Sequence, residues 1–517
     1  MNWKRYKSMP ALEKRAEIYY IIGLDIGNDS SGISFYNIAD GEPEIIDLSG
    51  GYGRPTIPTV MQYISDSKEW VFGEYAILNR GIGREVTLLD LVERLGNSEY
   101  IDIDKKPVSL VSLLGLYIKE IMSNVKNINP KAEIAGIVAS VPSYFSAQAR
   151  EELVRAFKNA GYERELIGLV SDRECVFAYH YRDAPLLDRE GEKSLLIDYG
   201  ARELRGGVYA ASGAGLRSLS SLFEESIGTR TVESAVKRMF ADFYGTKNPL
   251  QQGSERALQD QLMAFTYQHK DILFQKAIRN KPAKLYYNFA FPPFQQTVTA
   301  EEADTLTDPF RKRFNRFIQQ VLEKNQAEKV AATDIDVVIC VGGGFEMLWA
   351  REAVGSLFPQ SKLRLYRNSK AVTAMGAAFV AAQILGVADG QPPEVEDRHQ
   401  LAVDIGLEIS NRRFIPLAEC NSFWWQPHPS RYFIVNAPVE GDGKVPLTIL
   451  SRTPEGETSI LSDTPLRGLP ERPKGTTRLS VQVKFLSDRE AQVSVTDCGF
   501  GEMFPKTDYE QEIEVKL

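Results

Sequence analysis

The feature that most constrains the fold is a pattern that occurs twice. Residues 22–27 read IGLDIG and residues 195–200 read LLIDYG, and in each case a polar turn and a second strand-like run follow. Apolar runs joined by short polar turns predict β-hairpins. We therefore expect an internal duplication in which each copy places an aspartate, Asp25 or Asp198, near the tip of a hairpin.

A third glycine turn, residues 342–344, follows the apolar run VVICV and precedes a helix-like segment. Turn glycines allow backbone amides to approach an anion closely, and a helix N-terminus favours negative charge. Purely structural explanations of the glycines and aspartates also remain open. The glycines could serve only turn conformation or strand–helix packing, and the two aspartates could be strand-end carboxylates bonded by neighbouring amides.

The order of elements divides the chain. Strand–turn–helix alternation over residues 20–387, after an extension over 1–19, predicts an α/β fold with a sheet covered by helices. Residues 388–399, rich in proline and acidic side chains, predict a linker. Beyond it, residues 400–517 show only short strand-like runs between turns, which predicts a small antiparallel β domain.

Composition excludes several classes of function. The net charge of −8 argues against nucleic acid or an anionic membrane as the main partner. We find no apolar run of about 18 residues, so we expect neither a membrane span nor an export signal. The four cysteines and four histidines show no metal-ligand spacing, which favours free thiols in a reducing cytoplasm and predicts no zinc site.

Three segments resemble motifs of one family. Residues 141–148 (VPSYFSAQ), 369–378 (SKAVTAMGAA) and 466–475 (LRGLPERPKG) resemble segments of the heat shock protein 70 family of chaperones, in the actin-like ATPase superfamily. The resemblance covers residues 21–517 in order. It implies an actin-like ATPase fold with two lobes around a nucleotide cleft, followed by a β-sandwich that binds extended peptide. The family's helical lid is expected to be missing.

The resemblance also implies roles for particular residues. It implies ATP or ADP as the nucleotide, with Mg²⁺ positioned by Asp25 and Asp198. Asp172 would orient the attacking water, so that Asp172 and Asp198 are the expected catalytic residues. The expected cofactor-binding residues are Asp25, Gly27, Asn28, Gly200, Gly228, Thr229, Gly342, Gly343 and Gly344.

The same positions depart from the family's pattern. Asn28 and Asp29 stand where the family has paired threonines, and the second turn has Ala201 and Arg202 in place of two glycines. In that turn Glu203 replaces a threonine and Arg205 replaces a distal aspartate. No lysine lies near residues 91–96, where the family's catalytic lysine is expected, and Arg94 is the nearest cation. We expect Arg202 and Arg205 to lie on a solvated surface.

The expected function is therefore that of a divergent, cytoplasmic chaperone. It would bind adenine nucleotide weakly, hydrolyse it slowly or not at all, and hold unfolded peptide or a client protein on the β domain, with possible co-chaperones. Residues 423–425 (FWW) could contact the peptide or belong to the core. The alternative is a pseudo-ATPase scaffold without enzymatic activity. A small-molecule kinase of the superfamily is disfavoured, because those enzymes lack the β domain.

Overall fold

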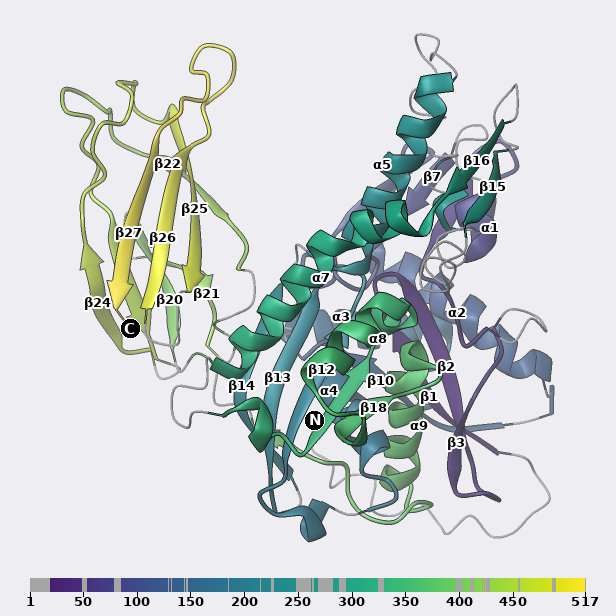
Figure 1. Cartoon of the computed structure of the whole chain (residues 1–517). Helices are drawn as coiled ribbons and strands as arrows, with labels where there is room; N and C mark the ends of the chain where they lie inside the picture. Colours follow the sequence, from purple (N-terminus) through teal and green to yellow (C-terminus); the bar gives the residue numbers. More distant parts are fainter. Residues whose placement is uncertain are drawn as a thin grey trace. The chain divides into compact units, whose positions relative to one another are not determined.

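The computed structural model describes most of the chain as two compact units, one ending at Glu396 and one starting at Asp397. The described residues are 19–48, 54–78, 85–247, 262, 265–267, 282–396 and 401–516, except for 129, 132, 144, 146, 185, 214, 225–226, 288–293, 324–329, 402, 410–412, 421, 423, 425–427, 454–455 and 486–489. Within these ranges, no helix is long and apolar enough to cross a membrane. Each unit is described by itself (Figure 1).

The first sheet of the larger unit is built on the first predicted hairpin. Strand β1 pairs antiparallel with β2 and parallel with β10, and β11 extends the parallel side. The strands are β1 (Tyr19–Ile26), β2 (Ser30–Asn37), β3 (Glu42–Ile45), β4 (Thr56–Pro58), β10 (Glu133–Val141) and β11 (Leu166–Ser171). The apolar residues of β1 and β10 are buried on both faces of the sheet, as is usual for strands covered by helices.

The second sheet repeats this topology. Strand β12 pairs antiparallel with β13 and parallel with β17, and β18 extends the parallel side. The strands are β12 (Lys193–Tyr199), β13 (Leu204–Ser212), β14 (Gly215–Glu224), β17 (Val337–Val341), β18 (Leu363–Leu365) and β19 (Val395–Glu396). Since β12 takes the place of β1, both predicted hairpins and the internal duplication are confirmed. We call residues 19–171 the first half and residues 193–365 the second half.

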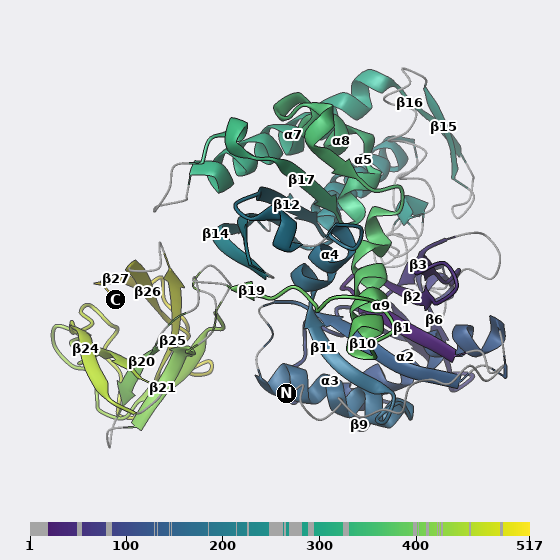
Figure 2. The same cartoon turned by 90° about the horizontal axis from the view of Figure 1, so that it is seen from below.

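Helices cover the outer side of each sheet. In the first half, apolar side chains of α2 (Leu110–Ile128) and α3 (Ala147–Ala160) share one core with β1 and β10. In the second half, α5 (Thr229–Lys247), α7 (Ala300–Glu323) and α8 (Leu348–Leu357) share one core with β12 and β17. Figures 1 and 2 show both sets of helices on their sheets. Smaller elements are β5 (Met61–Ile64), β6 (Glu69–Phe72), α1 (Glu74–Leu78), β7 (Glu85–Leu88), β8 (Tyr100–Ile103), β9 (Lys106–Ser109), β15 (Ala283–Tyr287) and β16 (Phe294–Val298).

Helix α9 (Val372–Ile384) connects the two halves, together with α4 (Asp172–His180) (Figure 2). Val372 and Met375 pack with core residues of the second sheet, such as Leu196, and Val380 packs with Ile21 of the first sheet. The helix is apolar all round, which is typical of a helix buried on every side.

Two glycines let α9 approach its neighbours at backbone distance. A Cβ atom on Gly23 of β1 would overlap the Ala374 carbonyl oxygen and the Ala378 amide nitrogen of α9. A Cβ atom on Gly376 would overlap the Cys175 carbonyl oxygen of α4. No larger residue fits at these crossings. Packing therefore explains the glycine at position 376, which belongs to the segment 369–378 that resembles a family motif.

The smaller unit is a sandwich of two antiparallel four-stranded sheets. One has the order β21-β20-β23-β24 and the other β22-β25-β26-β27. The strands are β20 (Asp404–Ile409), β21 (Arg413–Ala418), β22 (Arg431–Val435), β23 (Thr448–Arg452), β24 (Thr458–Asp463), β25 (Thr477–Phe485), β26 (Glu490–Asp497) and β27 (Glu510–Lys516). Both sheets contribute to one core, in which Leu407 and Ile449 join Val481 and Val493.

A buried ion pair lies inside the sandwich. Both terminal nitrogens of Arg472 donate to Asp497, at 2.8 and 2.7 Å, and the two side chains are 3% and 0% exposed. The carboxylate also accepts hydrogen bonds from the amides of Gly499 and Thr507, each at 3.0 Å. Burial raises the pKa of Asp497, but the bonds from Arg472, Gly499 and Thr507 outweigh it and hold this pKa below its ordinary value.

Replacing Arg472 should therefore destabilise the sandwich strongly. In an Arg472→Met variant, the Asp497 charge remains buried without its partner, and we expect the free energy of unfolding to fall by about 3–5 kcal/mol. The measurement is urea denaturation of the full chain, followed by a probe in the sandwich. As the matched control, Arg452→Met removes the more exposed pair with Asp404, at 2.7 Å, and should cost roughly 1 kcal/mol. Equal losses for the two variants would contradict the assignment.

Candidate functional site

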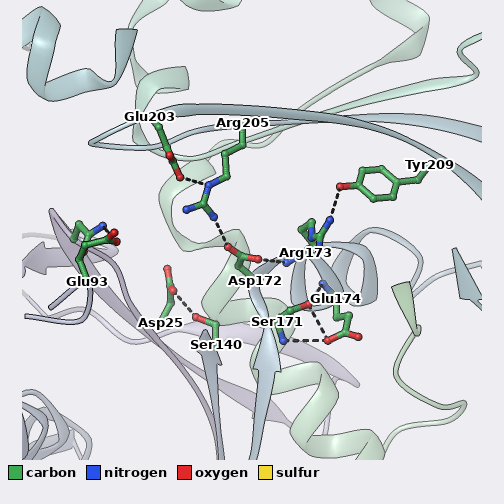
Figure 3. Close-up of polar contacts among 11 residues, drawn as sticks. Asp25, Glu93, Ser140, Ser171, Asp172, Arg173, Glu174, Glu203, Arg205 and Tyr209 are labelled. Carbon is green, nitrogen blue, oxygen red and sulfur yellow. Dashed lines mark hydrogen bonds and ion pairs between the residues drawn. The ribbon is translucent and has the colours of Figure 1, made fainter. Parts of the chain in front are cut away.

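The two hairpins place their aspartates at equivalent positions, one residue before each strand ends. Asp25 lies opposite Gly32 in the first hairpin, and Asp198 lies opposite Arg205 in the second. The Asp25 carboxylate accepts a hydrogen bond from the Ser140 hydroxyl of β10 at 2.5 Å (Figure 3). The duplication thus gives each sheet a carboxylate at the same point of its topology.

Both aspartates are partly buried, and further negative charge lies near their carboxylates. Desolvation by the surrounding protein raises the pKa of Asp25 to about 7, against the lowering effect of the Ser140 bond, and the charges of Asp172 and Asp198 add to the rise. Desolvation also raises the pKa of Asp198 to about 6, although the Arg205 charge lowers it. Asp25, Asp172 and Asp198 therefore act on one another electrostatically, as the sequence predicts for residues of one site.

Asp172 stands at the start of α4, directly after β11. Ser171 caps this helix, because its hydroxyl accepts the Glu174 amide at 3.2 Å while the Glu174 carboxylate accepts the Ser171 amide at 3.0 Å. One carboxylate oxygen of Asp172 accepts the Arg173 amide at 2.8 Å. The other accepts a terminal nitrogen of Arg205 at 2.9 Å (Figure 3).

Arg205 is part of the site and does not lie on a solvated surface, so that prediction is wrong. Its guanidinium bonds to Asp172 and to Glu203, and its side chain is 20% exposed. The residue follows the second hairpin turn, and its register opposite Asp198 turns it toward these carboxylates. A sequence pattern cannot show this, because Asp172 comes from a different strand end.

Arg202 and Arg230 make further ion pairs nearby, including one of Arg230 with Asp29 at 3.7 Å. Arg202 lies 3.0 Å from the Glu93 carboxylate, so it is paired although its side chain is 39% exposed. Arg230 lies 2.5 Å from the Asp90 carboxylate and donates to the Asn28 carbonyl oxygen at 2.8 Å. The Asn28 side chain donates to Glu93 at 3.2 Å. Asp90 and Glu93 were not identified from the sequence, although they lie where the family's lysine is expected.

The amides of the two hairpin glycines are used within their own turns. Gly27 donates to the Ser30 carbonyl at 3.1 Å, and Gly200 donates to the Glu203 carbonyl at 3.0 Å. The Thr229 amide donates to the Gly200 carbonyl at 3.0 Å, and Gly228 packs against the Arg202 carbonyl. The second turn therefore rests on the start of α5. A role of these four residues in phosphate binding stays a prediction.

The third glycine turn lies against the second hairpin. Gly342 has a φ of 91°, and a Cβ atom there would lie 2.6 Å from a carboxylate oxygen of Asp198. A Cβ atom on Gly344 would overlap the Tyr199 ring, whereas one on Gly343 would meet only the flexible Lys370 side chain, at 2.8 Å. Close packing thus explains Gly342 and Gly344, and adenosine binding by residues 342–344 stays a prediction.

Other predicted features lie elsewhere. Arg94 pairs with Glu99 at 2.5 Å, so its charge is used within its own loop. Phe423 and Trp425 fall outside the described residues. Trp424 packs on the sandwich core. Ser140 was missed, although it is a polar residue in the apolar run before Pro142.

The carboxylates suit a hydrated Mg²⁺ ion. Mg²⁺ in proteins is usually held by one or two carboxylates and keeps several waters. Asp25 and Asp198 supply two carboxylates whose ionisation the surroundings disfavour, and a bound cation would offset this. Over the part of the chain that the structure describes, no group of three or more His, Cys, Asp or Glu side chains could hold a metal by itself.

Comparison with known proteins supports the resemblance. The chain is 23% identical to the chaperone protein DnaK of Thermosipho melanesiensis over 503 residues, which is 93% of this chain and 79% of that protein. It is 22% identical to DnaK of Thermosipho africanus and 23% identical to DnaK of Thermotoga petrophila, again over 93% of this chain. The matched regions are 78% of the Thermosipho africanus protein and 79% of the Thermotoga petrophila protein. This long, weak similarity supports a relation to the heat shock protein 70 chaperones.

Two family profiles also match parts of the chain. Residues 42–206 match the C-terminal part of a family of unknown function (DUF5716), and residues 400–517 match a domain of unknown function (DUF8552). The second match coincides closely with the β-sandwich unit.

The two neighbouring glycines of the third turn should respond differently to the same substitution. Gly344→Ala forces the Tyr199 ring to move, and we expect it to lower the free energy of unfolding by about 1–3 kcal/mol. Gly343→Ala displaces only the end of the Lys370 chain and should cost less than about 1 kcal/mol. Thermal unfolding without nucleotide measures both. If the two variants were equally stable, packing would not be the reason for Gly344.

Proposed function

We propose that this chain is a heat shock protein 70-like chaperone that binds adenine nucleotide weakly and hydrolyses it slowly or not at all. The main support is the placement of Asp25, Asp172 and Asp198 at strand ends of two sheets with the same topology. In this proposal the two halves are the lobes of an actin-like ATPase, and the carboxylates belong to its nucleotide site. The 79% coverage of DnaK chains is consistent with it.

The proposed roles follow from the positions of the side chains. Asp25 and Asp198 would hold Mg²⁺, which when bound would neutralise charge on the phosphate oxygens. The turns at Gly27 and Gly200 would lie beside the phosphates, and residues 342–344 beside the adenosine. Asp172 would orient the attacking water.

The contacts of Asp172 are the reason to propose slow hydrolysis. Its two carboxylate oxygens already accept hydrogen bonds from the Arg173 amide and the Arg205 guanidinium. Each oxygen therefore already has a donor within the chain, which competes with a water for the same lone pairs. A water at this position would therefore be activated poorly.

Titration calorimetry tests this proposal. We expect weak heats with ATP and ADP at millimolar concentration, larger with Mg²⁺ than without, and hydrolysis slower than about 1 per second. In Asp198→Asn the effect of Mg²⁺ should shrink, because one of the two proposed ligands loses its charge. Asp188→Asn, an exposed aspartate in the same unit, is the matched control and should keep the full effect.

Two outcomes would contradict it. Turnover at roughly 1 per second or faster would show that Asp172 is an effective catalytic group in spite of its contacts. Absence of binding of both nucleotides would favour the alternative, a scaffold that has kept the fold without the nucleotide chemistry. The ion pairs at Arg202, Arg205 and Arg230 are the observation that favours this alternative.

We also propose that the sandwich binds an extended, apolar peptide or a partner's segment by adding it as a strand. Strand β22 is an edge strand of its sheet and pairs with β25. Tyr432 and Ile434, on alternate positions of β22, are 58% and 49% exposed. An edge strand offers main-chain hydrogen bonds, and exposed apolar side chains offer shallow contacts beside them.

Charge on this edge should weaken peptide binding. We expect Tyr432→Asp/Ile434→Asp to bind a labelled unfolded peptide at least about tenfold more weakly than the unmodified chain, because two apolar contacts are lost. Fluorescence anisotropy with the full chain measures this. Ile460→Asp changes an exposed residue of β24 on the other sheet and serves as the control. If the peptide bound equally to all three proteins, β22 would not be the contact.

A further inference from the structure

Three ion pairs at the candidate site run between the two halves with the same polarity. In each of them an arginine of the second half meets a carboxylate that lies in the first half or directly follows its last strand. The pairs are Arg202 with Glu93 at 3.0 Å, Arg205 with Asp172 at 2.9 Å and Arg230 with Asp90 at 2.5 Å. In all three pairs the positive charge therefore lies in the second half, and the negative charge lies in the first half or directly after it.

Hydrogen bonds connect the loop that carries Asp90 and Glu93 to helix α3. The buried carboxylate of Glu152 in α3 accepts the Gly96 amide at 2.7 Å and the Ser98 amide at 3.2 Å. Within the loop, the Arg94 amide donates to the Asp90 carbonyl at 3.2 Å. These bonds fix the direction in which Asp90 and Glu93 are presented. The resemblance implies the family's lysine near residues 91–96, whereas this loop presents the carboxylates of Asp90 and Glu93.

Carboxylates and phosphates compete for the same donors of an arginine. A guanidinium binds either group through its planar N–H donors, with similar geometry. Arg202 and Arg230 are 39% and 29% exposed, so an anion from solution can reach them. In the structure, Arg202 pairs with Glu93. Arg230 pairs with Asp90, donates to the Asn28 carbonyl and lies 3.7 Å from the Asp29 carboxylate.

We propose that Asp90 and Glu93 form an internal clamp with Arg230 and Arg202 that excludes phosphate from these arginines. The clamp holds the two halves together without a ligand, and a polyphosphate binds only by displacing the two carboxylates. This inference rests on the proposed function only for the location of the phosphates. The ligand class is a polyphosphate, free or as part of a nucleotide.

Removing the two acidic charges should strengthen anion binding. We expect Asp90→Asn/Glu93→Gln to bind inorganic tripolyphosphate about tenfold more tightly than the unmodified chain, at about threefold for each exposed pair removed. Asparagine tolerates the left-handed backbone that Asp90 adopts, with φ at 56°, so the loop is kept. Calorimetry at low salt measures the affinity.

Two control variants define the effect. Glu99→Gln makes the same change of charge in a pair of similar exposure, but its partner Arg94 lies in the same loop, so affinity should not change. Arg202→Gln should lose affinity for tripolyphosphate at least about threefold, because it removes a donor together with the clamp.

Hydrogen exchange separates a clamp from a general effect of charge. If phosphate displaces Asp90 and Glu93, adding tripolyphosphate to the unmodified chain should speed amide exchange over residues 89–96. A carboxylate that is merely near the anion predicts unchanged or slower exchange there. In Asp90→Asn/Glu93→Gln, exchange over these residues should already be fast and should not rise further.

The outcomes are decisive. Equal or weaker binding of tripolyphosphate by Asp90→Asn/Glu93→Gln, including no binding by either protein, overturns the clamp. So does slower or unchanged exchange over residues 89–96 in the unmodified chain at saturation. If the clamp behaves as expected but ADP binds no better than pyrophosphate, the clamp stands and the adenine part of the proposed function fails.

Discussion

The larger unit depends on the backbone-to-backbone packing of α9. Gly23 and Gly376 allow this helix to touch β1 and α4 without intervening side chains, and its apolar residues enter the cores on both sides. Deleting buried contacts of this kind is costly, because a close-packed interior relaxes only partly. The carboxylates Asp25, Asp172 and Asp198 sit at the ends of the elements that α9 brings together. Their proximity is therefore a result of apolar packing, which acts against their mutual repulsion.

Packing and chemistry constrain different residues of the site. Gly23, Gly344 and Gly376 are fixed by overlaps with backbone or with a ring, so substitution there threatens the fold. Arg202, Glu203 and Arg205 occupy a turn whose side chains face other charges, and such positions can change without loss of the core. This difference explains how the topology of the two sheets can be preserved while the second hairpin turn departs from the pattern of the family that the chain resembles.

The sequence predicts those features of the fold that depend on local patterns of residues. The hairpins and the duplication follow from periodicity and turn residues, and they are confirmed. In the smaller unit, short strand-like runs between turns predict an antiparallel β domain, but they do not predict which strands pair or in which order. The ion pairs could not be predicted, because Arg205 and Asp172 meet only after two sheets have packed. For the same reason, the sequence could not show that Gly344 is needed by Tyr199.

The connection between the halves has two parts that differ in their response to the solvent. Ion pairs with partly exposed partners, such as Arg202 with Glu93, are screened as ionic strength rises, since the Debye length is about 10 Å at 0.1 M and about 3 Å at 1 M. The contact of α9 with both sheets is apolar, and salts such as sulfate strengthen it by being excluded from the protein surface. In concentrated sulfate, the ion pairs between the halves are therefore weakened, and the apolar contact of α9 with both sheets is strengthened.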